Sequence, residues 1–220
     1  IVGFESDMRE EMKICENMQK ALLRRGPDQR GIVLTECAAL VHTRLAVIDV
    51  VNGRQPMKFM QGEQTYIIVY NGELYNTSEI RKELETDFKF ETASDTEVVL
   101  KAYVKWGAEC VDKFNGIFAF AVWEEHNRKL FVARDRIGVK PFFYWKGNNK
   151  FIFASELGAL LEHPEVPRIL DEKSVAELLL IAPGRTPGSA VFKDVCEIKP
   201  GWCGYYSKDD ISEPLHYVNR

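Results

Sequence analysis

The sequence predicts an α+β fold in which antiparallel sheets pack between groups of helices. Short strands joined by hairpin turns cluster in the second half of the chain, and segments with helical periodicity lie on either side of them. The apolar run 117–123 lacks polar alternation, so it is expected to be covered on both faces. Two packed sheets between helices satisfy these observations.

Capping and turn residues divide the first half of the chain into elements. Asp7-x-x-Glu10 is a capping signature and Gly26-Pro27 a stop, so a helix is expected between them. The expected elements are a buried strand at 1–4, this helix, strands at about 31–35 and 38–48 turned by Glu36-Cys37, a loop with Asn52-Gly53 and Pro56, a strand at 66–70 that stops abruptly at Asn71-Gly72, and a helix from about Thr77.

The second half begins with another capping signature, Ser94-x-x-Glu97, which opens a helix that ends at Trp106 before Gly107. Two hairpins follow, and then short helices. The expected elements are strands at 117–123 and 130–133, strands at 141–145 and 151–153, helices at 156–161 and about 173–180, and a short strand pair near 191–206.

Composition excludes several classes of protein. The 220 residues suit one large domain or two very small ones. The 29 Lys and Arg and the 33 Asp and Glu are interspersed, with a net charge of −4, so neither nucleic acid nor a membrane surface is an expected partner. No apolar run approaches the ~20 residues that cross a bilayer. The residue pattern at the start of the sequence is not that of a secretory leader, so none is expected.

Cysteine and histidine spacing bears on compartment and metal. The five cysteines form no C-x-x-C pair, and the four histidines are scattered. These patterns favour reduced thiols in a cytoplasmic protein and no metal site.

Seven short motifs are spread over nearly the whole chain. They are Arg25-Gly26-Pro27-Asp28, His42-Thr43-Arg44-Leu45-Ala46-Val47-Ile48-Asp49, Asn71-Gly72-Glu73-Leu74-Tyr75-Asn76, Ser94-Asp95-Thr96-Glu97, Asn115-Gly116-Ile117-Phe118-Ala119-Phe120, Arg134-Asp135-Arg136-x-Gly138-x-Lys140-Pro141 and Ala154-Ser155-Glu156. In content and order they resemble the glutamine amidotransferase domain of glutamine-hydrolysing asparagine synthetases. The resemblance implies the four-layer αββα sandwich of antiparallel sheets found in N-terminal-nucleophile hydrolases.

The resemblance also implies a function. Residues 1–207 would form a glutaminase domain, and 208–220 would begin a linker to a C-terminal synthetase domain. The glutaminase would hydrolyse glutamine to glutamate and ammonia, and the ATP-dependent partner domain would use the ammonia to amidate aspartate. The glutaminase domain would need no cofactor, whereas ATP and Mg would belong to the synthetase domain. Whether the protein forms a homodimer stays open.

The site residues follow from the motifs that match the family. Arg44 would bind the α-carboxylate of glutamine, since a guanidinium fork suits a carboxylate. Glu73 and Asp95 would receive its α-ammonium group. Asn71 and Gly72 would donate to the oxyanion. Backbone groups along the stretch Arg44, Leu45, Ala46, Val47 and Ile48 would complete the pocket.

Each of these residues also has a plainer interpretation. Arg44 could be an ion-pair arginine at a strand end, and Asn71-Gly72 could be a hairpin turn. Asp95 in a first helical turn is favoured by the helix dipole alone. His42 is interpreted as a hydrogen-bonded strand histidine, and Cys15 and Cys37 as small hydrophobes. Arg25 to Asp28 and Arg134-Asp135 are expected to brace the site without touching substrate.

The nucleophile of the family is a cysteine that would stand two positions before Ile1, and it is absent from the printed chain. Whether the printed residues alone are active is therefore open. Two alternatives remain: a catalytically silent glutamine-binding module, and the glutaminase of a related enzyme with another acceptor, such as glucosamine-6-phosphate synthase or amidophosphoribosyltransferase.

Overall fold

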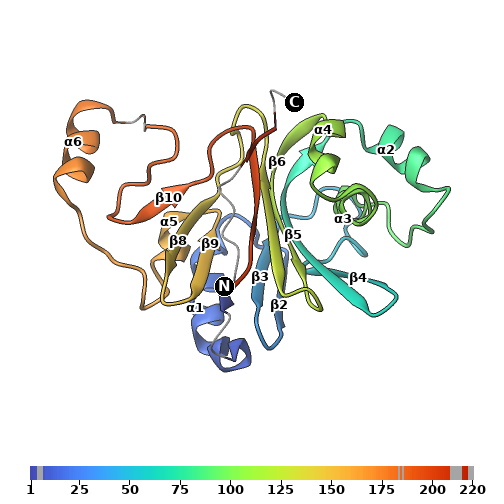
Figure 1. Cartoon of the computed structure of the whole chain (residues 1–220), viewed down its shortest axis with the longest axis horizontal. Coiled ribbons are helices and arrows are strands. Elements are labelled where there is room, and N and C mark those ends of the chain that lie inside the picture. The colour runs from blue at the N-terminus through green and yellow to red at the C-terminus, as the bar shows by residue number, and fades with distance from the viewer. Residues whose placement is uncertain (4–6, 183, 185, 209–214, 218–220) are drawn as a thin grey trace.

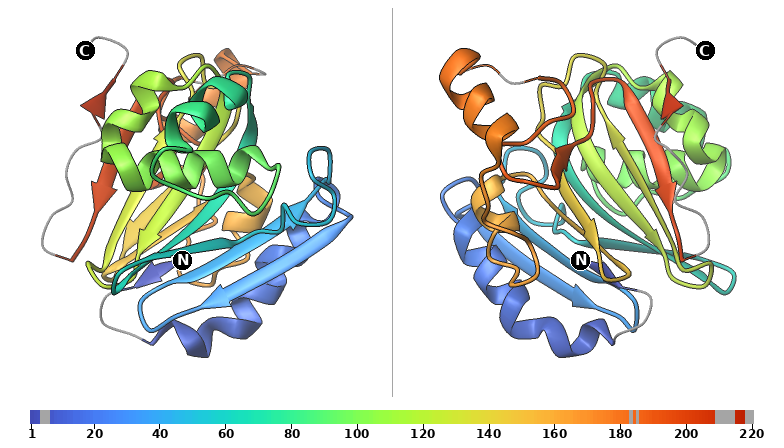
Figure 2. Two further views of the ribbon diagram at one scale, coloured as in Figure 1. Left: turned by 90° about the vertical axis from the view of Figure 1, so that its right-hand side faces the viewer. Right: turned by 60° about the vertical axis from the view of Figure 1, so that its left-hand side comes forward.

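Two antiparallel sheets pack face to face, and helices cover the outer face of each sheet (Figures 1 and 2). The computed structural model describes residues 1–3, 7–182, 184, 186–208 and 215–217, so Phe4 of the first expected strand lies outside the described residues. The expected α+β fold of antiparallel sheets between helices is confirmed.

The larger sheet has six strands in the order β12-β11-β7-β6-β5-β4, each antiparallel to its neighbours. The helices on its outer face are α2 (Thr77–Leu84), α3 (Asp95–Trp106) and α4 (Cys110–Lys113). Its strands are β4 (Met57–Gln61), β5 (Gln64–Leu74), β6 (Gly116–Glu124), β7 (Lys129–Arg134), β11 (Trp202–Tyr206) and β12 (Leu215–His216).

The smaller sheet has four strands in the order β1-β9-β8-β10. They are β1 (Val2–Gly3), β9 (Lys150–Ala154), β8 (Phe143–Gly147) and β10 (Val195–Glu197). Helices α1 (Met12–Leu22) and α5 (Leu157–Leu160) pack on its side of the molecule. A separate hairpin of β2 (Gln29–Leu34) and β3 (Ala39–Arg44) lies against α1, as Figure 2 shows.

Three hydrophobic cores separate the four layers. One lies between α2, α3, α4 and the larger sheet, and another joins α1 and α5 to the smaller sheet and the hairpin. The third lies between the two sheets and contains Trp123, Phe151 and Tyr206. Ala121, Val122 and Trp123 are fully buried because β6 has the inter-sheet core on one face and the helix core on the other. Burial on both faces explains why the sequence of this strand does not alternate between apolar and polar residues.

Three expected elements differ from the observed ones. β3 ends at Arg44 because residues 45–50 leave the ribbon and turn around the Arg44 guanidinium. β5 does not stop at Asn71, because residues 71–74 pair with 116–119 of β6. The strands expected to pair near 191–206 lie in different sheets: β10 pairs with β8 and β11 with β7, since the chain crosses between the sheets at 198–201.

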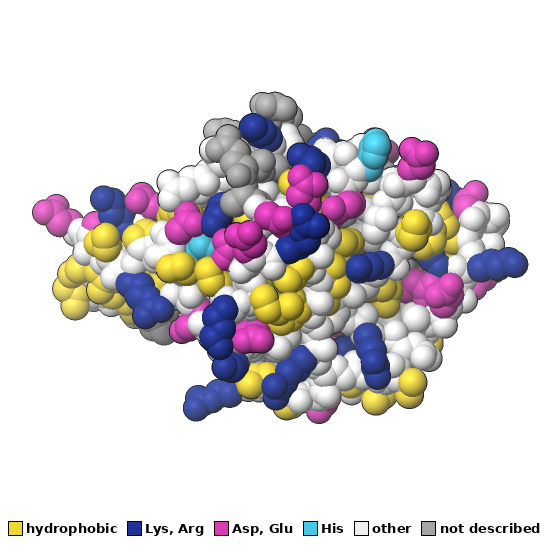
Figure 3. Space-filling view, turned by 90° about the horizontal axis from the view of Figure 1, so that it is seen from below, with side chains coloured by type: hydrophobic (Ala, Val, Ile, Leu, Met, Phe, Trp, Pro, Cys, Tyr) yellow, Lys and Arg dark blue, Asp and Glu magenta, His cyan; other side chains and the backbone are white. Residues whose placement is uncertain are grey.

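Two features lie at the margins of the domain. Helix α6 (Glu172–Leu180) buries Ser174 and Glu177 but leaves Leu179 and Leu180 78% and 83% exposed, and hydrophobic side chains gather at that end of Figure 3. At the other margin, β12 pairs with β11, and buried Tyr217 donates to the Arg134 carbonyl (2.8 Å). The division into a domain at 1–207 and a linker at 208–220 stays a prediction. Among the described residues, no helix is long and apolar enough to span a bilayer.

Candidate glutamine-binding site

A cavity of about 390 Å³ opens where β3, β5 and β6 meet the beginning of the chain and the start of α3. Eight of the nine residues expected to hold substrate line it. They are Arg44, Leu45, Val47, Ile48, Asn71, Gly72, Glu73 and Asp95. Ile1 is also part of the wall, and its backbone nitrogen donates to the Ala39 carbonyl (2.9 Å). Ala46 is the exception: its N–H donates to the Asp28 carboxylate (2.8 Å). The expected convergence of these residues on one pocket is therefore present, and their roles stay predictions.

Arg44 places a buried positive charge in the wall, with only 7% of the residue exposed. Its guanidinium donates to the Gln29 side-chain oxygen (2.8 Å), the Asp49 carbonyl (2.9 Å) and the carbonyls of residues 48 and 50. All of these acceptors are neutral oxygens. Within the described part of the chain, Arg44 forms no ion pair with a carboxylate. A buried cation without an internal counter-ion favours an anion in the cavity.

Asp95 supplies a second buried ionisable group to the cavity wall, at the first position of α3. The Ser94 side chain caps this helix by accepting from the Thr96 N–H (3.2 Å). The Asp95 carboxylate accepts from the Tyr70 hydroxyl (2.9 Å) and the Leu74 N–H (3.3 Å). Burial raises the pKa of Asp95, and these hydrogen bonds oppose the rise. An ammonium group in the cavity would favour the ionised form of this carboxyl.

Asn71 lies on the face of β5 that points between the sheets, together with Ile67 and Val69. Asn71 lines the cavity, and its side-chain nitrogen, Nδ2, is buried and has no hydrogen-bond partner in the described structure. Leaving a buried donor unpaired costs about 1–3 kcal/mol. A ligand oxygen in the cavity would satisfy it.

The Gly72 N–H also points toward the cavity, because successive residues of a strand direct their backbone groups to alternate sides. Gly72 lies opposite Phe118 of β6, and both backbone groups of Phe118 bind Asp135 instead of Gly72. The Phe118 carbonyl accepts from the Asp135 N–H (2.7 Å), and the Phe118 N–H donates to the Asp135 carboxylate. Gly72 and Phe118 therefore form a non-hydrogen-bonded pair, and the N–H of Gly72 faces away from β6. β4 does not reach this far, because its pairing with β5 ends at Ile68. The sequence prediction that the strand ends here is wrong, but one edge of the strand is open.

The absence of a side chain at Gly72 has a packing cause. A Cβ atom there would lie 2.4 Å from the Ile117 carbonyl and 2.8 Å from Phe118 Cα, which is closer than real contacts allow. Glycine therefore lets β5 and β6 approach closely at the position whose N–H meets the cavity. Glu73, the next residue, is exposed at the cavity wall.

His42 is a hydrogen-bonded strand histidine, as interpreted from the sequence, but it also lines the cavity. Its Nε2 lies 3.2 Å from the Tyr70 carbonyl oxygen, which can only accept, so the proton is on Nε2. Nδ1 is buried without a partner in the described structure. Burial lowers the pKa of His42 to about 4, so its ring is neutral near pH 7.

The two motifs expected to brace the site, Arg25 to Asp28 and Arg134-Asp135, differ in position relative to the cavity. Arg134 donates to the carbonyls of Lys140 (2.6 Å) and Gly138 (2.7 Å), and Asp135 accepts from the Val139 N–H (3.0 Å) and the Lys140 N–H (3.0 Å). They hold the loop whose Lys140 and Pro141 line the cavity, and neither of them lines it. Arg25, by contrast, is itself part of the wall, and the expectation that it does not touch substrate stays a prediction.

Gln55, Tyr70 and Thr96 also line the cavity, and none of them is among the site residues expected from the sequence. Gln55 Nε2 donates to the Tyr70 carbonyl (3.1 Å) and Thr96 Oγ1 (3.1 Å), and Gln55 Oε1 accepts from the Tyr70 N–H (2.6 Å). The sequence gives no signal for Tyr70 or Gln55, because a tyrosine in an apolar strand and a glutamine in a loop carry no catalytic signature. No cysteine lines the cavity among the described residues, and burial raises the pKa of Cys15 and Cys37.

Comparison with known proteins agrees with this geometry. The sequence model of the family described as "Glutamine amidotransferase domain" matches residues 1–217. Asparagine synthetase [glutamine-hydrolyzing] 3 of Bacillus subtilis is 45% identical over 212 residues, which is 96% of this chain and 34% of that protein. Asparagine synthetase B of Escherichia coli is 33% identical over 73% of this chain and 29% of that protein. The chain thus spans about a third of the length of these relatives.

Solved structures share the fold. The glutamine phosphoribosylpyrophosphate amidotransferase from B. subtilis has a TM-score of 0.68 and 18% sequence identity, and the match covers 94% of this chain and 47% of that one. A structure described as the allosteric regulatory enzyme of purine biosynthesis has a TM-score of 0.70 at 18% identity, over 98% of this chain and 48% of that one. The fold is therefore shared with a known amidotransferase.

Proposed function

Because this chain belongs to the glutamine amidotransferase domain family, we propose that its cavity binds glutamine and hydrolyses the side-chain amide to glutamate and ammonia. One observation carries the proposal: two neighbouring donors, Asn71 Nδ2 and the Gly72 N–H, have no acceptor in the described structure. The walls of the same cavity also contain a buried cation, Arg44, and a buried carboxylate, Asp95. These groups match the charges of an amino acid and the oxygen of its side-chain amide.

In the proposed complex, Arg44 binds the α-carboxylate, and Asp95 and Glu73 receive the α-ammonium group. The side-chain amide then extends toward β5. Its carbonyl oxygen becomes negative when the amide carbon is attacked, and Asn71 and Gly72 donate to it. Such donors each contribute about 3–4 kcal/mol to the transition state in other enzymes. Pairing with β6 holds the β5 backbone that carries both donors.

The proposed nucleophile is the thiolate of a cysteine two positions before Ile1 in the intact protein, as the family resemblance implies. The sulfur forms a bond to the amide carbon, and the amide nitrogen leaves as ammonia with a proton from the cysteine α-amino group. Water then breaks the thioester, giving glutamate and restoring the thiol. The position of Ile1 in the cavity wall supports this arrangement.

The partner of the domain is proposed from the relatives. They are asparagine synthetases about three times as long as this chain. We propose that the intact protein also contains an ATP- and Mg-dependent synthetase domain that amidates aspartate with the ammonia. The glutaminase domain itself needs no cofactor in this scheme.

One experiment tests both levels. Intact protein is incubated with glutamine, with and without ATP, Mg and aspartate, and glutamate, ammonia and asparagine are quantified. Glutamate and ammonia without asparagine would indicate a different acceptor. Glutamine binding without hydrolysis would favour the silent binding module, and no binding would contradict the proposal.

A further inference from the structure

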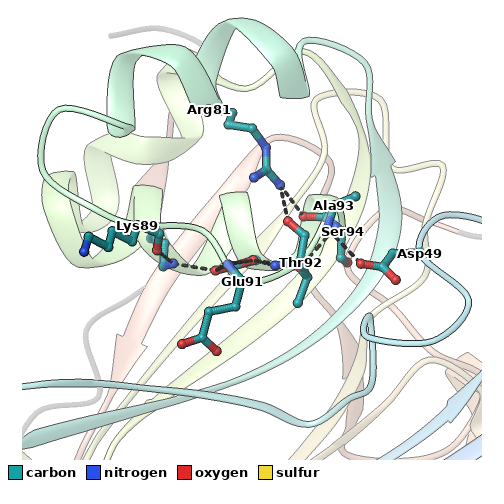
Figure 4. Close-up of polar contacts among 9 residues, drawn as sticks. Asp49, Arg81, Lys89, Glu91, Thr92, Ala93 and Ser94 are labelled. Carbon is teal, nitrogen blue, oxygen red and sulfur yellow. Dashed lines mark hydrogen bonds and ion pairs between the residues drawn. The ribbon is translucent and has the colours of Figure 1, made fainter.

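Asp49 links Arg44, a residue of the cavity wall, to the segment that precedes Asp95. Its backbone carbonyl accepts from the Arg44 guanidinium (2.9 Å), and its side chain reaches away from Arg44 to accept from the Ala93 N–H (2.8 Å). The other carboxylate oxygen accepts from the Asn52 N–H (2.9 Å). These two N–H donors hold the pKa of Asp49 below its usual range, so the carboxylate that links the two segments is ionised near neutral pH. Figure 4 shows the Asp49 side chain directed at residues 93–94.

The segment that Asp49 reaches is fixed to helix α3. Glu97, in the first turn of α3, accepts from the N–H groups of Glu91 (2.9 Å) and Thr92 (2.7 Å), and it forms a buried ion pair with Lys101. From the other side, Arg81 donates to the Thr92 carbonyl (2.9 Å), as Figure 4 shows. Ala93 is two residues before Asp95, so a shift at Ala93 moves the start of the helix.

The backbone of Asp49 explains why one residue can make both contacts. Its φ of +48° lies in the left-handed region, which aspartate and asparagine tolerate better than other side chains do. In this conformation the carbonyl turns toward Arg44 while the carboxylate turns toward Ala93. Gly53 completes the turn: its N–H donates to the same carbonyl (3.0 Å), and a Cβ there would lie 2.4 Å from Arg44 Nη2.

We propose that Asp49 is a positioning residue that fixes the separation between the Arg44 guanidinium and the Asp95 carboxylate. It thereby makes the cavity select a ligand that carries both an α-carboxylate and an α-ammonium group. The inference rests on the proposed glutamine site and adds the residue that sets its specificity. Asp49 itself touches no substrate; it acts through the two residues that do.

The test compares glutamine with glutaramate, which is glutamine without the α-ammonium group, as substrates of the intact protein. The wild-type protein prefers glutamine, because only glutamine uses Asp95. In Asp49→Ala, Arg44 and the segment that precedes Asp95 are no longer held together, so the ratio of kcat/KM for glutamine to that for glutaramate falls about tenfold, a fraction of the ~100-fold that a misplacement of about 1 Å can cost. The change lies in KM for glutamine, with kcat nearly constant.

Asp49→Asn is a second variant, which keeps the test valid if Asp49→Ala fails to fold. Asparagine tolerates the left-handed backbone and keeps one acceptor oxygen, so it can serve one of the two N–H groups only. The expected ratio is intermediate between wild type and Asp49→Ala. In parallel, hydrogen exchange of the 91–95 segment is faster in Asp49→Ala, because the Ala93 N–H loses its acceptor, and the rate in Asp49→Asn lies between those of wild type and Asp49→Ala. Asp87→Asn is the matched control, since Asp87 is an exposed carboxylate that pairs with Lys105 (2.5 Å) at the other end of α3.

The outcomes separate this inference from the proposed function. A wild-type protein that neither binds nor hydrolyses glutamine removes both. Wild-type hydrolysis with an unchanged preference in both Asp49 variants overturns the inference alone. Equal losses for glutamine and glutaramate would show that Asp49 serves general stability only, which also overturns it.

Discussion

The hydroxyl of Tyr70 donates to the carboxylate of Asp95 across 2.9 Å, which joins the open edge of β5 to the first turn of α3. The backbone of Tyr70 is held as well, because Gln55 pairs with both its N–H and its carbonyl. The donors proposed for the oxyanion follow Tyr70 directly on β5. The acceptor proposed for the ammonium group is therefore anchored to the same short segment.

Tyr70→Phe is expected to weaken glutamine binding and to move its pH dependence. The Tyr70 hydrogen bond opposes the effect of burial on Asp95, so its loss raises the pKa of that carboxyl further. Because ammonium binding needs the ionised carboxylate, KM for glutamine rises on acidification, and this rise begins at a higher pH in the variant. The KM–pH profile of the intact protein measures the shift. Tyr75→Phe, at an exposed tyrosine, is the control; coincident profiles for wild type and Tyr70→Phe would contradict the expectation.

The sequence predicted the elements that local signals define. The Ser94 cap and the Gly107 stop bound α3 as expected, and the apolar run of β6 has a core on each face. Asn71-Gly72 was misjudged because these two residues favour turns when considered alone. Pairing with residues 118–119, far along the chain, keeps them in β5, and only the strand order shows that one edge stays open.

The cavity residues were predictable only where a motif carried them. Arg44, Asp95 and Asn71 belong to recognisable motifs, whereas the buried contacts of Gln55 with Tyr70 and Thr96 depend on a loop that the sequence does not place. The link from Asp49 to Ala93 is likewise a tertiary contact between segments 44 residues apart. Local patterns hold no information about such pairs.

Arg44→Ala is expected to raise KM for glutamine sharply, because the charge that faces the α-carboxylate is lost. Arg44→Lys should recover only part of the affinity. It restores the charge, but an ammonium group lacks the planar fork of donors that now engages residues 29 and 48–50. Steady-state glutamine hydrolysis measures both variants, with Arg128→Ala at an exposed arginine as control. Unchanged KM in Arg44→Ala would reject the carboxylate role.

Asn71→Ala is expected to lower kcat about 100- to 1,000-fold with little change in KM, as expected for a donor that acts on the developing oxyanion. Its buried Nδ2 has no acceptor in the described structure, so the substitution removes no internal hydrogen bond of this nitrogen. Thermal unfolding should therefore change little. Asn127→Ala, at an exposed turn residue that donates to Glu124 (2.6 Å), is the control. A loss confined to KM would assign Asn71 to substrate binding instead.

His42 should make the free energy of unfolding depend on pH below neutrality. Burial lowers its pKa from 6.5 to about 4, so between these values the unfolded chain binds a proton that the folded protein does not. Stability therefore falls as the pH drops through this window, by about 2 kcal/mol for this group between about pH 7 and about pH 5.

Replacing His42 by glutamine isolates this contribution. The carboxylates and His163 titrate in wild type and variant alike, so the difference between their unfolding free energies, measured in urea at several pH values, reports His42. The variant should lose less stability on acidification by roughly the same 2 kcal/mol. His126→Gln, which removes an exposed histidine from the turn between β6 and β7, should follow the wild-type curve. Parallel curves for wild type and His42→Gln would mean that the folded protein admits a proton to this ring at little cost, and that His42 is more accessible from the cavity than its burial indicates.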